Sequence, residues 1–361
     1  MAEKLSTNNL WLSDIDKIIH SLPELDTLSG KSIMITGANG LICSAVVDIL
    51  IRYNETHTAA PVHITAAGRS PERLRERFGK FSGKKYFSFM NYDASRDRVG
   101  DFHADYIIHG ASNATPASMS AEPVETMLAN MLGTNTLLDY VKYDRGGGGI
   151  IRLLYISSSE VYGQRAENNS QPFTENDYGY VDLLNPRSCY PVSKRAAETL
   201  CVSYAAEYGA DVVIVRPGHI YGPTASERDN RVSSAFAYNA ARGENIIMKS
   251  DGLQLRSWCY CLDCAGAILK VLLRGENSHA YNIPGEIMNI REMSEMLAKF
   301  GGVKLIREGA LESERKTFNP MNNSSVDGAE IESLGWKNIF DAETGFEHTV
   351  RILREIQNPL P

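Results

Sequence analysis

A glycine-rich turn near the start of the chain constrains its fold more than any other feature. The short apolar run Lys31–Thr36 predicts a strand, and the apolar segment Leu41–Leu50 predicts a helix directly after it. Gly37 permits the tight turn between them, and Gly40 lets the backbone approach a pyrophosphate, whose charge a helix N-terminus attracts. An ordinary strand-to-helix turn is the plain alternative, but the placement favours a dinucleotide site.

The turn departs from the usual dinucleotide pattern at its third glycine, where Cys43 stands. A thiol is small enough to keep close packing between helix and strand. We assign Asn39, Leu41 and Ile42, with the two glycines, to the cofactor site.

The segment after the second expected strand, Val62–Ala67, bears on which dinucleotide is bound. It reads Gly68-Arg69-Ser70, without the acidic residue that binds ribose hydroxyls in NAD sites. Arg69 could instead accept a 2′-phosphate, stack on adenine or be solvated. Asp93 stands where an adenine contact would fit. We therefore expect NAD, with NADP left open because of Arg69.

Further apolar runs alternate with helical stretches along the chain. Strands are expected at Tyr106–Ala111, Ile151–Ser157 and Val212–Val215, and helices at 122–143 and 190–208. This alternation predicts an α/β fold with a doubly wound parallel sheet, the Rossmann fold.

Three parts of the chain are expected. Residues 1–30 form an N-terminal helical extension in which Ser13 could cap a helix, and 31–216 form the NAD(P)-binding domain. Residues 217–361, where the pattern becomes irregular, mainly form a smaller α/β substrate lobe. Part of about 255–275 returns to the first domain.

Tyr190 and Lys194 are the candidate catalytic pair. They stand at i and i+4, so they share one helix face, where the ammonium can lower the tyrosine pKa and prepare a general base. A surface pair is the ordinary explanation of this spacing. Ser158 changes the weighing, because it follows a strand at the sheet edge where ligands bind, and its hydroxyl can donate to a substrate oxygen.

The motifs as a set resemble a known family. In chain order they are TGANGLIC, HGAS, NMLGT, YISSSEVYG, CYPVSKRAAE, RPGHIYGPT and LGW. They are similar to those of the extended short-chain dehydrogenases of the NAD-dependent epimerase/dehydratase family, which act on nucleotide sugars. The resemblance covers about residues 31–350.

The resemblance implies roles for individual residues. Tyr190 would take the proton of the sugar 4-hydroxyl while the C4 hydride moves to the nicotinamide, and Lys194 would hold the nicotinamide ribose. Ser158 would bind the reacting oxygen, and Asn130 would position the surroundings of the lysine. Gly37, Gly40 and Asp93 would hold the dinucleotide. The substrate would then be a nucleotide sugar that passes through a 4-keto intermediate.

The step after oxidation is read from neighbouring residues. Ser159 stands where 4,6-dehydratases carry an acid donor, whereas Glu160, which simple 4-epimerases replace by a small neutral residue, is kept. SEVYG is most similar to UDP-glucuronate decarboxylases, in which a 4-keto uronic acid loses carbon dioxide. Ser159, Arg231 and Arg256 are expected at the substrate, and Arg256 could hold a carboxylate or the diphosphate. Thr224 departs from those decarboxylases, which carry arginine there.

Other outcomes stay open. They are 4-epimerisation, 4,6-dehydration, net reduction with cofactor exchange, and a non-catalytic dinucleotide-binding protein. Assembly is expected to be a homodimer, because the helices that bear Asn130 and Tyr190 resemble those that form the family's dimer interface.

Bulk properties exclude some functions. With 37 basic and 44 acidic residues the net charge is −7, which argues against nucleic acid as a partner. No run approaches about 18 apolar residues, and no secretory signal is visible, so neither a membrane span nor export is expected. Six cysteines suggest reduced thiols and a cytoplasmic protein. Cys259, Cys261 and Cys264 lack the paired spacing and the histidine of a metal site.

Overall fold

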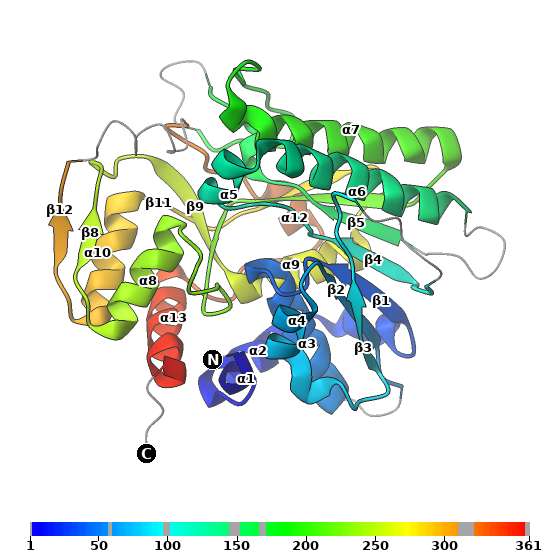
Figure 1. The fold of residues 1–361 in the computed structure, drawn as a ribbon, viewed down its shortest axis with the longest axis horizontal. Coiled ribbons are helices and arrows are strands. Elements are labelled where there is room, and N and C mark those ends of the chain that lie inside the picture. Colours follow the sequence, from blue (N-terminus) through cyan, green and yellow to red (C-terminus); the bar gives the residue numbers. More distant parts are fainter. Residues whose placement is uncertain are drawn as a thin grey trace.

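A seven-stranded parallel sheet forms the centre of the protein. The structure is a computed structural model that describes residues 2–56, 60–96, 102–143, 152–165, 171–309 and 321–357. The strand order is β10-β6-β5-β4-β1-β2-β3, which contains the 3-2-1-4-5-6 order of dinucleotide-binding folds (Figure 1). The predicted Rossmann fold is therefore confirmed.

The bounds of the elements are as follows. The strands of the large sheet are β1 (Ser32–Thr36), β2 (His63–Gly68), β3 (Phe87–Asn91), β4 (Tyr106–His109), β5 (Arg152–Ile156), β6 (Val212–Pro217) and β10 (Ala280–Ile283). The helices beside it are α3 (Leu41–Thr56), α4 (Pro71–Phe78), α5 (Pro116–Ala121), α6 (Pro123–Tyr143), α7 (Cys189–Tyr208) and α9 (Cys261–Arg274).

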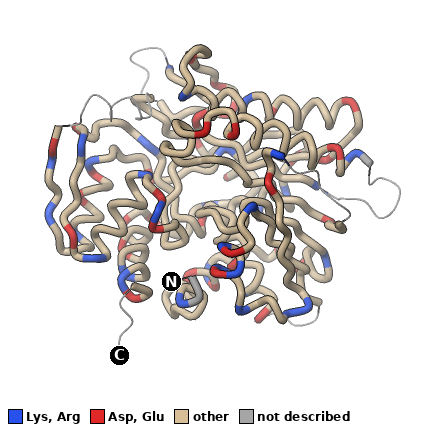
Figure 2. The backbone as a smooth tube through the Cα atoms, viewed as in Figure 1, with Lys and Arg blue, Asp and Glu red and all other residues tan. Residues whose placement is uncertain are grey.

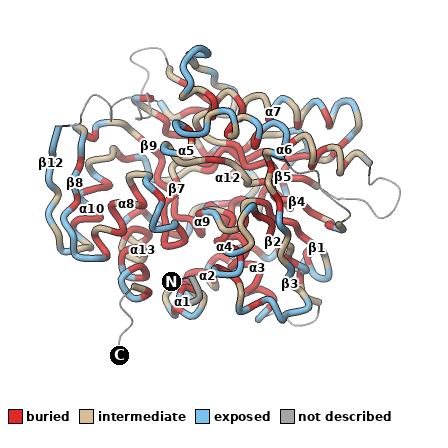
Figure 3. The backbone as a smooth tube through the Cα atoms, in the orientation of Figure 1, coloured by how far each residue is buried: buried red, intermediate tan, exposed pale blue. Residues whose placement is uncertain are grey.

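Alternating side chains of the strands bury both faces of this sheet. On β5, Leu154 and Ile156 join the core that contains residues of α3 and α9, whereas Leu153 and Tyr155 join the core that contains residues of α6 and α7. Figure 3 shows the strands as the buried middle of this layered body. Strands covered on both faces read as near-continuous apolar runs, which is why β1, β4 and β6 could be recognised from the sequence.

Two strands of the large sheet were not predicted. β3 is exposed at Ser88 and Asn91 and only Phe87 is buried, so it lacks a continuous apolar run. β10 has four residues and pairs in parallel with the outer strand β6. It lies at 280–283, beyond the stretch 255–275 that was expected to return to this domain. Within that stretch, α9 packs on the sheet, whereas β9 (Leu255–Tyr260) belongs to the lobe.

Most of the remaining elements form a smaller lobe beside the carboxyl edge of the sheet (Figure 1), whereas α12 (Ala329–Ser333) contacts β10 of the large sheet. A three-stranded sheet has the order β11-β9-β7, and a second sheet pairs β12 with β8. The elements not yet bounded are β7 (His219–Tyr221), α8 (Val232–Arg242), β8 (Ile246–Met248), β11 (Glu286–Asn289), α10 (Ile290–Gly301), β12 (Leu305–Arg307) and α13 (Ala342–Gln357).

The N-terminal extension forms α1 (Ala2–Leu5), α2 (Asn9–His20) and the 3₁₀ turn η1 (Pro23–Leu28). The cap of α2 is Asn8, whose side chain accepts from the backbone of Trp11, so the expected Ser13 cap is wrong. Ser13 lies inside the helix because buried apolar residues begin with Trp11, two positions before it.

Helix α2 contacts both lobes. The indole of Trp11 donates to Asp48 of α3 at 3.0 Å, and Asp14 lies 2.7 Å from Nδ1 of His348 on α13. Both side chains are fully buried. The extension is therefore part of the folded body and contacts both lobes.

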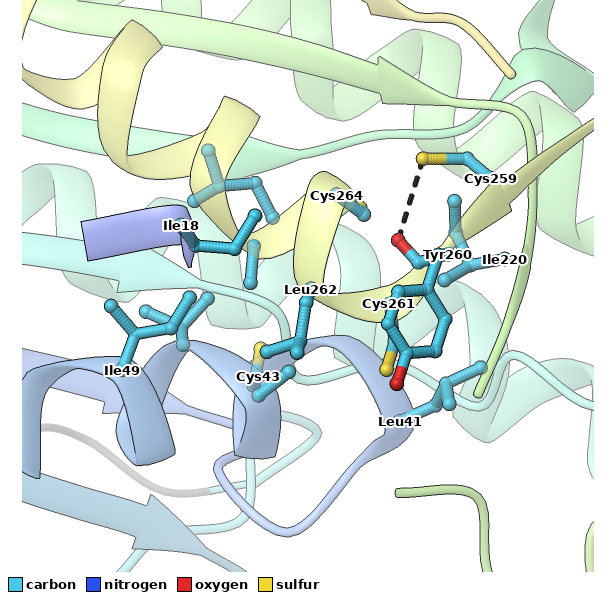
Figure 4. Packing of buried hydrophobic residues seen from close by; sticks show 14 of the residues in the cluster. Ile18, Leu41, Cys43, Ile49, Ile220, Cys259, Tyr260, Cys261, Leu262 and Cys264 are labelled. Carbon is cyan, nitrogen blue, oxygen red and sulfur yellow. Dashed lines mark hydrogen bonds between the residues drawn. The ribbon is translucent and has the colours of Figure 1, made fainter. Parts of the chain in front are cut away.

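The cysteines of CYCLDC lie in the apolar core. Figure 4 shows Cys43, Cys261 and Cys264 within one cluster of apolar side chains that includes Ile18, Ile49 and Leu262. All six cysteines are buried and free, and burial raises the thiol pKa of Cys261 to about 12. Within the described ranges no group of metal-binding side chains was found.

Other features of the chain can be stated briefly. No described helix has the length and apolar character needed to span a bilayer. Acidic and basic residues are mixed along the backbone (Figure 2). The four consecutive glycines 146–149 and the basic residues 315 and 316 lie outside the described residues.

Candidate active site

The glycine turn has the geometry expected of a dinucleotide cradle. Gly37 has a φ of +68°, and a Cβ there would lie 2.8 Å from the carbonyl oxygen of Gly110. A Cβ on Gly40 would lie 3.1 Å from the Gly37 oxygen. Only glycine therefore leaves this backbone open to a phosphate group, and α3 begins at the next residue, Leu41. These residues fit a dinucleotide pyrophosphate.

The thiol of Cys43 fits against the sheet because the residue that it faces, Gly110, has no side chain. A Cβ on Gly110, which follows β4, would overlap the Sγ of Cys43 and would lie 3.1 Å from Cδ1 of Ile156. The missing side chain at Gly110 thus makes room for the thiol that replaces the third glycine. The close contact between α3 and the sheet is kept because the larger side chain at Cys43 is matched by the absence of a side chain at Gly110.

The remaining predicted cofactor residues line the same edge. Asn39 and Ile42 are half-buried beside the turn, and Leu41 is buried. Arg69 is exposed directly after β2, and Asp93 follows β3, with its carboxylate bound by the hydroxyl of Ser95 at 2.7 Å. The structure therefore brings the predicted set to the carboxyl ends of adjacent strands.

Tyr190 and Ser158 meet at the end of β5. Ser158 caps the short helix η4 (Ser159–Tyr162), its Oγ accepting from the backbone of Glu160 at 3.1 Å. Tyr190 is buried at the start of α7, and its hydroxyl interacts with the Ser158 hydroxyl. The phenol and the serine are thus placed to share one substrate oxygen.

The expected effect of Lys194 on the Tyr190 pKa is wrong for this structure. Burial raises that pKa to about 12, and the charge of Glu160 raises it further, while Ser158, Arg231 and Arg187 lower it. Nζ of Lys194 donates instead to the carbonyl of Ile156 at 2.7 Å.

The i, i+4 spacing places both side chains on one helix face. Burial of the phenol, which raises its pKa, cannot be seen from that spacing. The Lys194 ammonium lies 5.7 Å from the centre of the Tyr190 ring. Burial also lowers the pKa of Lys194 itself to about 7.

Asn130 of α6 fixes the backbone of α7 beside this pair. Its Nδ2 donates to the Ser193 hydroxyl at 2.9 Å, and that hydroxyl bonds the carbonyls of Cys189 and Tyr190. The Oδ1 of Asn130 is buried with no hydrogen-bond partner among the described residues. The predicted positioning role therefore acts through Ser193, which precedes Lys194.

Glu160 is held by a residue to which the sequence analysis gave no role. Arg187 donates from Nη2 to both carboxylate oxygens, at 3.0 and 3.1 Å, and both side chains are largely buried. Arg187 lies three residues before Tyr190, in the turn η5 (Pro186–Ser188). Its position two residues before the recognised CYPVSKR run was the available signal, but its partner lies 27 residues away along the chain.

Two more predicted arginines approach from the lobe. Arg231 caps α8 and pairs with Asp229, and its charge reaches Tyr190. Arg256 of β9 is 3% exposed and its charge interacts with Glu160. Ser159 is buried in η4. The substrate-side predictions thus converge on one region, which contains Glu160 and Tyr190.

His219 was also missed. It begins β7, and its Nδ1 is buried without a hydrogen-bond partner in the part of the chain that the structure describes. Burial holds its pKa well below the usual range, and the charges of Arg256 and Arg231 lower it further. The imidazole is therefore a neutral polar group between two cations.

Comparisons with known proteins agree with this geometry. Residues 33–284 match the model of the NAD dependent epimerase/dehydratase family. The chain belongs to this family. UDP-glucuronic acid decarboxylase 6 of Arabidopsis thaliana is 33% identical over 269 residues, which is 74% of this chain and 73% of that protein. The predicted enzyme family is confirmed.

Solved structures share the fold at lower identity. A dTDP-glucose 4,6-dehydratase of Streptomyces venezuelae with NAD bound has a TM-score of 0.74 and 24% identity, over 90% of this chain and 97% of that one. A UDP-glucuronic acid 4-epimerase of Bacillus cereus, in complex with UDP-glucuronic acid and NAD, has a TM-score of 0.73 and 20% identity, over 90% and 99%.

The close packing of Cys43 against Gly110 predicts a compensating pair of substitutions. Gly110→Ala should lower the free energy of unfolding by about 1–3 kcal/mol, because the new methyl group overlaps the thiol. Cys43→Ala removes that thiol, so the double variant should regain most of the loss. Urea denaturation of the four proteins measures the coupling, and strictly additive effects would contradict it.

The buried Lys194 predicts a pH-dependent stability. Because its pKa falls from 10.5 to about 7 on folding, the unfolded chain holds a proton in this window that the folded enzyme has released. Stability from this group therefore rises with pH, by up to about 1.4 kcal/mol per unit. Lys194→Met should remove the rise, whereas Lys85→Met, at an exposed site, should keep it. Denaturation series across this window that run parallel for wild type and Lys194→Met would contradict the assignment.

Proposed function

We propose that the enzyme decarboxylates a UDP-linked uronic acid, most simply UDP-glucuronate, through a 4-keto intermediate. The observation that carries the choice is the buried Arg256. In the described part of the chain its side chain makes one hydrogen bond, from Nη1 to the carbonyl of Leu255 at 2.8 Å. Burial lowers its pKa to about 10, and Glu160 raises it. A buried cation without a bonded carboxylate favours an anionic ligand.

A uronic acid supplies this anion at the right place. Once C4 is oxidised, the carboxylate on C5 is that of a β-keto acid, and breaking the C5–C6 bond releases carbon dioxide and leaves the electron pair on an enolate. C5 of the enolate then takes a proton from water, which regenerates the 4-ketone for the return of the hydride. Arg256 would bind the carboxylate before carbon dioxide is released. Arg231 would bind the diphosphate, since bidentate guanidinium groups suit both anions.

Tyr190 and Ser158 would act on C4. Ser158 donates to the C4 oxygen, and Tyr190 removes its proton, which is general base catalysis by a phenolate. When bound, the dinucleotide accepts the C4 hydride and later returns it. Lys194 would hold the ribose next to the nicotinamide. In the same region the buried Oδ1 of Asn130 accepts no hydrogen bond from the described residues. The enzyme would therefore be redox-neutral overall.

Glu160 would keep two guanidinium groups in position. Its oxygens are bonded by Arg187, and its charge is felt by Arg256. A dehydratase needs a proton donor near C6, and Ser159 is buried where that donor would stand. These features favour decarboxylation over 4,6-dehydration. A 4-epimerase shares the oxidation step, and the fold of the Bacillus cereus epimerase keeps this as the second candidate.

The substrate and the general base are tested together. Purified enzyme incubated with UDP-glucuronate should release carbon dioxide and form a UDP-pentose, detected by mass spectrometry. Tyr190→Phe should lower kcat by about 10²–10⁴-fold while NADH still binds, and Tyr208→Phe at the other end of α7 should not. A uronic acid product of unchanged mass would show epimerisation instead.

We also propose that the enzyme is a cytoplasmic homodimer assembled through α6 and α7. Four apolar side chains on α6 are exposed at helical spacing, namely Val124, Leu128, Met131 and Leu132. They are 38–61% exposed, and such a stripe beside a packed helix suits a second copy of the same surface.

Charges placed in this stripe should separate the subunits. The double variant Leu128→Glu and Leu132→Glu would bury two carboxylates at the interface, so light scattering during gel filtration should report half the wild-type mass. Ile287→Glu, at an exposed apolar position on the lobe, should leave the mass unchanged. A wild type that runs as a monomer would contradict the proposal.

A further inference from the structure

The carboxyl end of β2 lacks the group that distinguishes NAD sites. In this fold a carboxylate near the end of the second strand accepts hydrogen bonds from the adenosine ribose. Here β2 ends at Gly68 and continues into Arg69 and Ser70. The ribose end of the cofactor groove therefore carries the guanidinium of Arg69, where a carboxylate would accept a hydrogen bond from the 2′-hydroxyl.

The missing carboxylate does not reflect a lack of space. A Cβ on Gly68 would lie 3.6 Å from Oδ1 of Asn39 and 3.6 Å from Cδ2 of Leu74, which are ordinary contacts. Asn39 belongs to the glycine turn, so Gly68 borders the cradle itself. Position 68 therefore has room for a Cβ, and the charged side chain that follows β2 in this sequence is that of Arg69.

Arg69 is available to a ligand at this place. It is exposed, and within the described ranges its guanidinium makes no hydrogen bond or ion pair. Asp93 shows on which side its charge acts: burial raises the pKa of that carboxyl, but the bonds from Ser95 and the charges of Arg69 and Arg96 lower it below its usual value. Asp93 lies just after β3, the strand next to β2, at the place where an adenine contact is expected. The charge of Arg69 therefore acts at the adenosine end of the groove.

A second arginine and a hydroxyl accompany it. Ser70 caps α4, its Oγ accepting from the backbone of Arg73 at 3.3 Å and donating to Glu72 at 3.0 Å. Arg73 is exposed in the first turn of the same helix. Glu72 opposes the two cations, but its exposed carboxylate is already bonded to Ser70. Ser70 serves as the cap of the helix, and the two guanidinium groups beside the helix N-terminus are a suitable set for a phosphate monoester.

We propose that Arg69 and Arg73 bind the 2′-phosphate of NADP, so that this enzyme prefers NADP to NAD. The inference depends on the Rossmann fold and the family, and it is independent of which sugar reaction follows. Failure of UDP-glucuronate turnover would therefore leave it standing, and its own failure would leave the decarboxylation proposal standing.

Binding of the reduced cofactors tests the proposal without turnover. The full chain, stripped of any retained dinucleotide, is titrated with NADPH and with NADH, following nicotinamide fluorescence. We expect NADPH to bind at least about tenfold more tightly. Titration with 2′,5′-ADP and with 5′-ADP examines the ribose end alone, and the first should bind more tightly. Equal affinities, or a preference for NADH, would overturn the proposal.

Matched variants identify the residues responsible. Arg69→Gln should weaken NADPH binding about tenfold and leave NADH binding unchanged, whereas Arg75→Gln, an exposed arginine further along α4, should affect neither. Gly68→Asp combined with Arg69→Ser should reverse the preference. Since that pair also changes the edge of the cradle, Arg69→Gln alone decides the case. Equal effects of Arg69→Gln on both cofactors would refute a 2′-phosphate contact.

Discussion

A hydrogen bond from the buried Nζ of Lys194 to the carbonyl of Ile156 fixes α7 against the central sheet. Ile156 is the last residue of β5, and the chain reaches Ser158 two residues later. One turn before Lys194, Tyr190 is thereby placed beside that serine. If this bond were lost, a buried amino group would remain unpaired and the phenol would lose its fixed relation to the strand end. The geometry of the whole site depends on this contact between helix and strand.

The charges around this contact are not balanced, and that imbalance determines what the site can bind. Arg187 is paired with Glu160 and Arg231 with Asp229, but Arg256 has only a main-chain hydrogen bond in the described residues. Burial first, and then the charges of Arg256 and Arg231, make protonation of the nearby imidazole of His219 unfavourable and hold its pKa low. The excess of one buried cation makes an anionic sugar more suitable than a neutral one, because a carboxylate would complete the pairing.

The sequence was most informative where one local segment determines the structure. The glycine turn, the buried strands and the Tyr190–Lys194 helix could be read from spacing alone. The short outer strands β3 and β10 could not, because neither forms a continuous apolar run. Arg187 and His219 were missed since their surroundings come from distant segments. The pKa of Tyr190 was misjudged for the same reason, because its burial depends on the packing of the whole site.

The two lobes must keep their relation for these charges to meet. On the cofactor side, the hydroxyl of Thr224 donates to the carbonyl of Leu41 at 2.7 Å, which ties a lobe loop to the first residue of α3. On the far side, α2 bonds α3 through Trp11 and α13 through Asp14. Thr224 stands where similar decarboxylases carry arginine, so a position that could have held a charge forms an inter-lobe bond instead. That exchange leaves Arg231 and Arg256 as the arginines that the lobe brings to the substrate side of the described site.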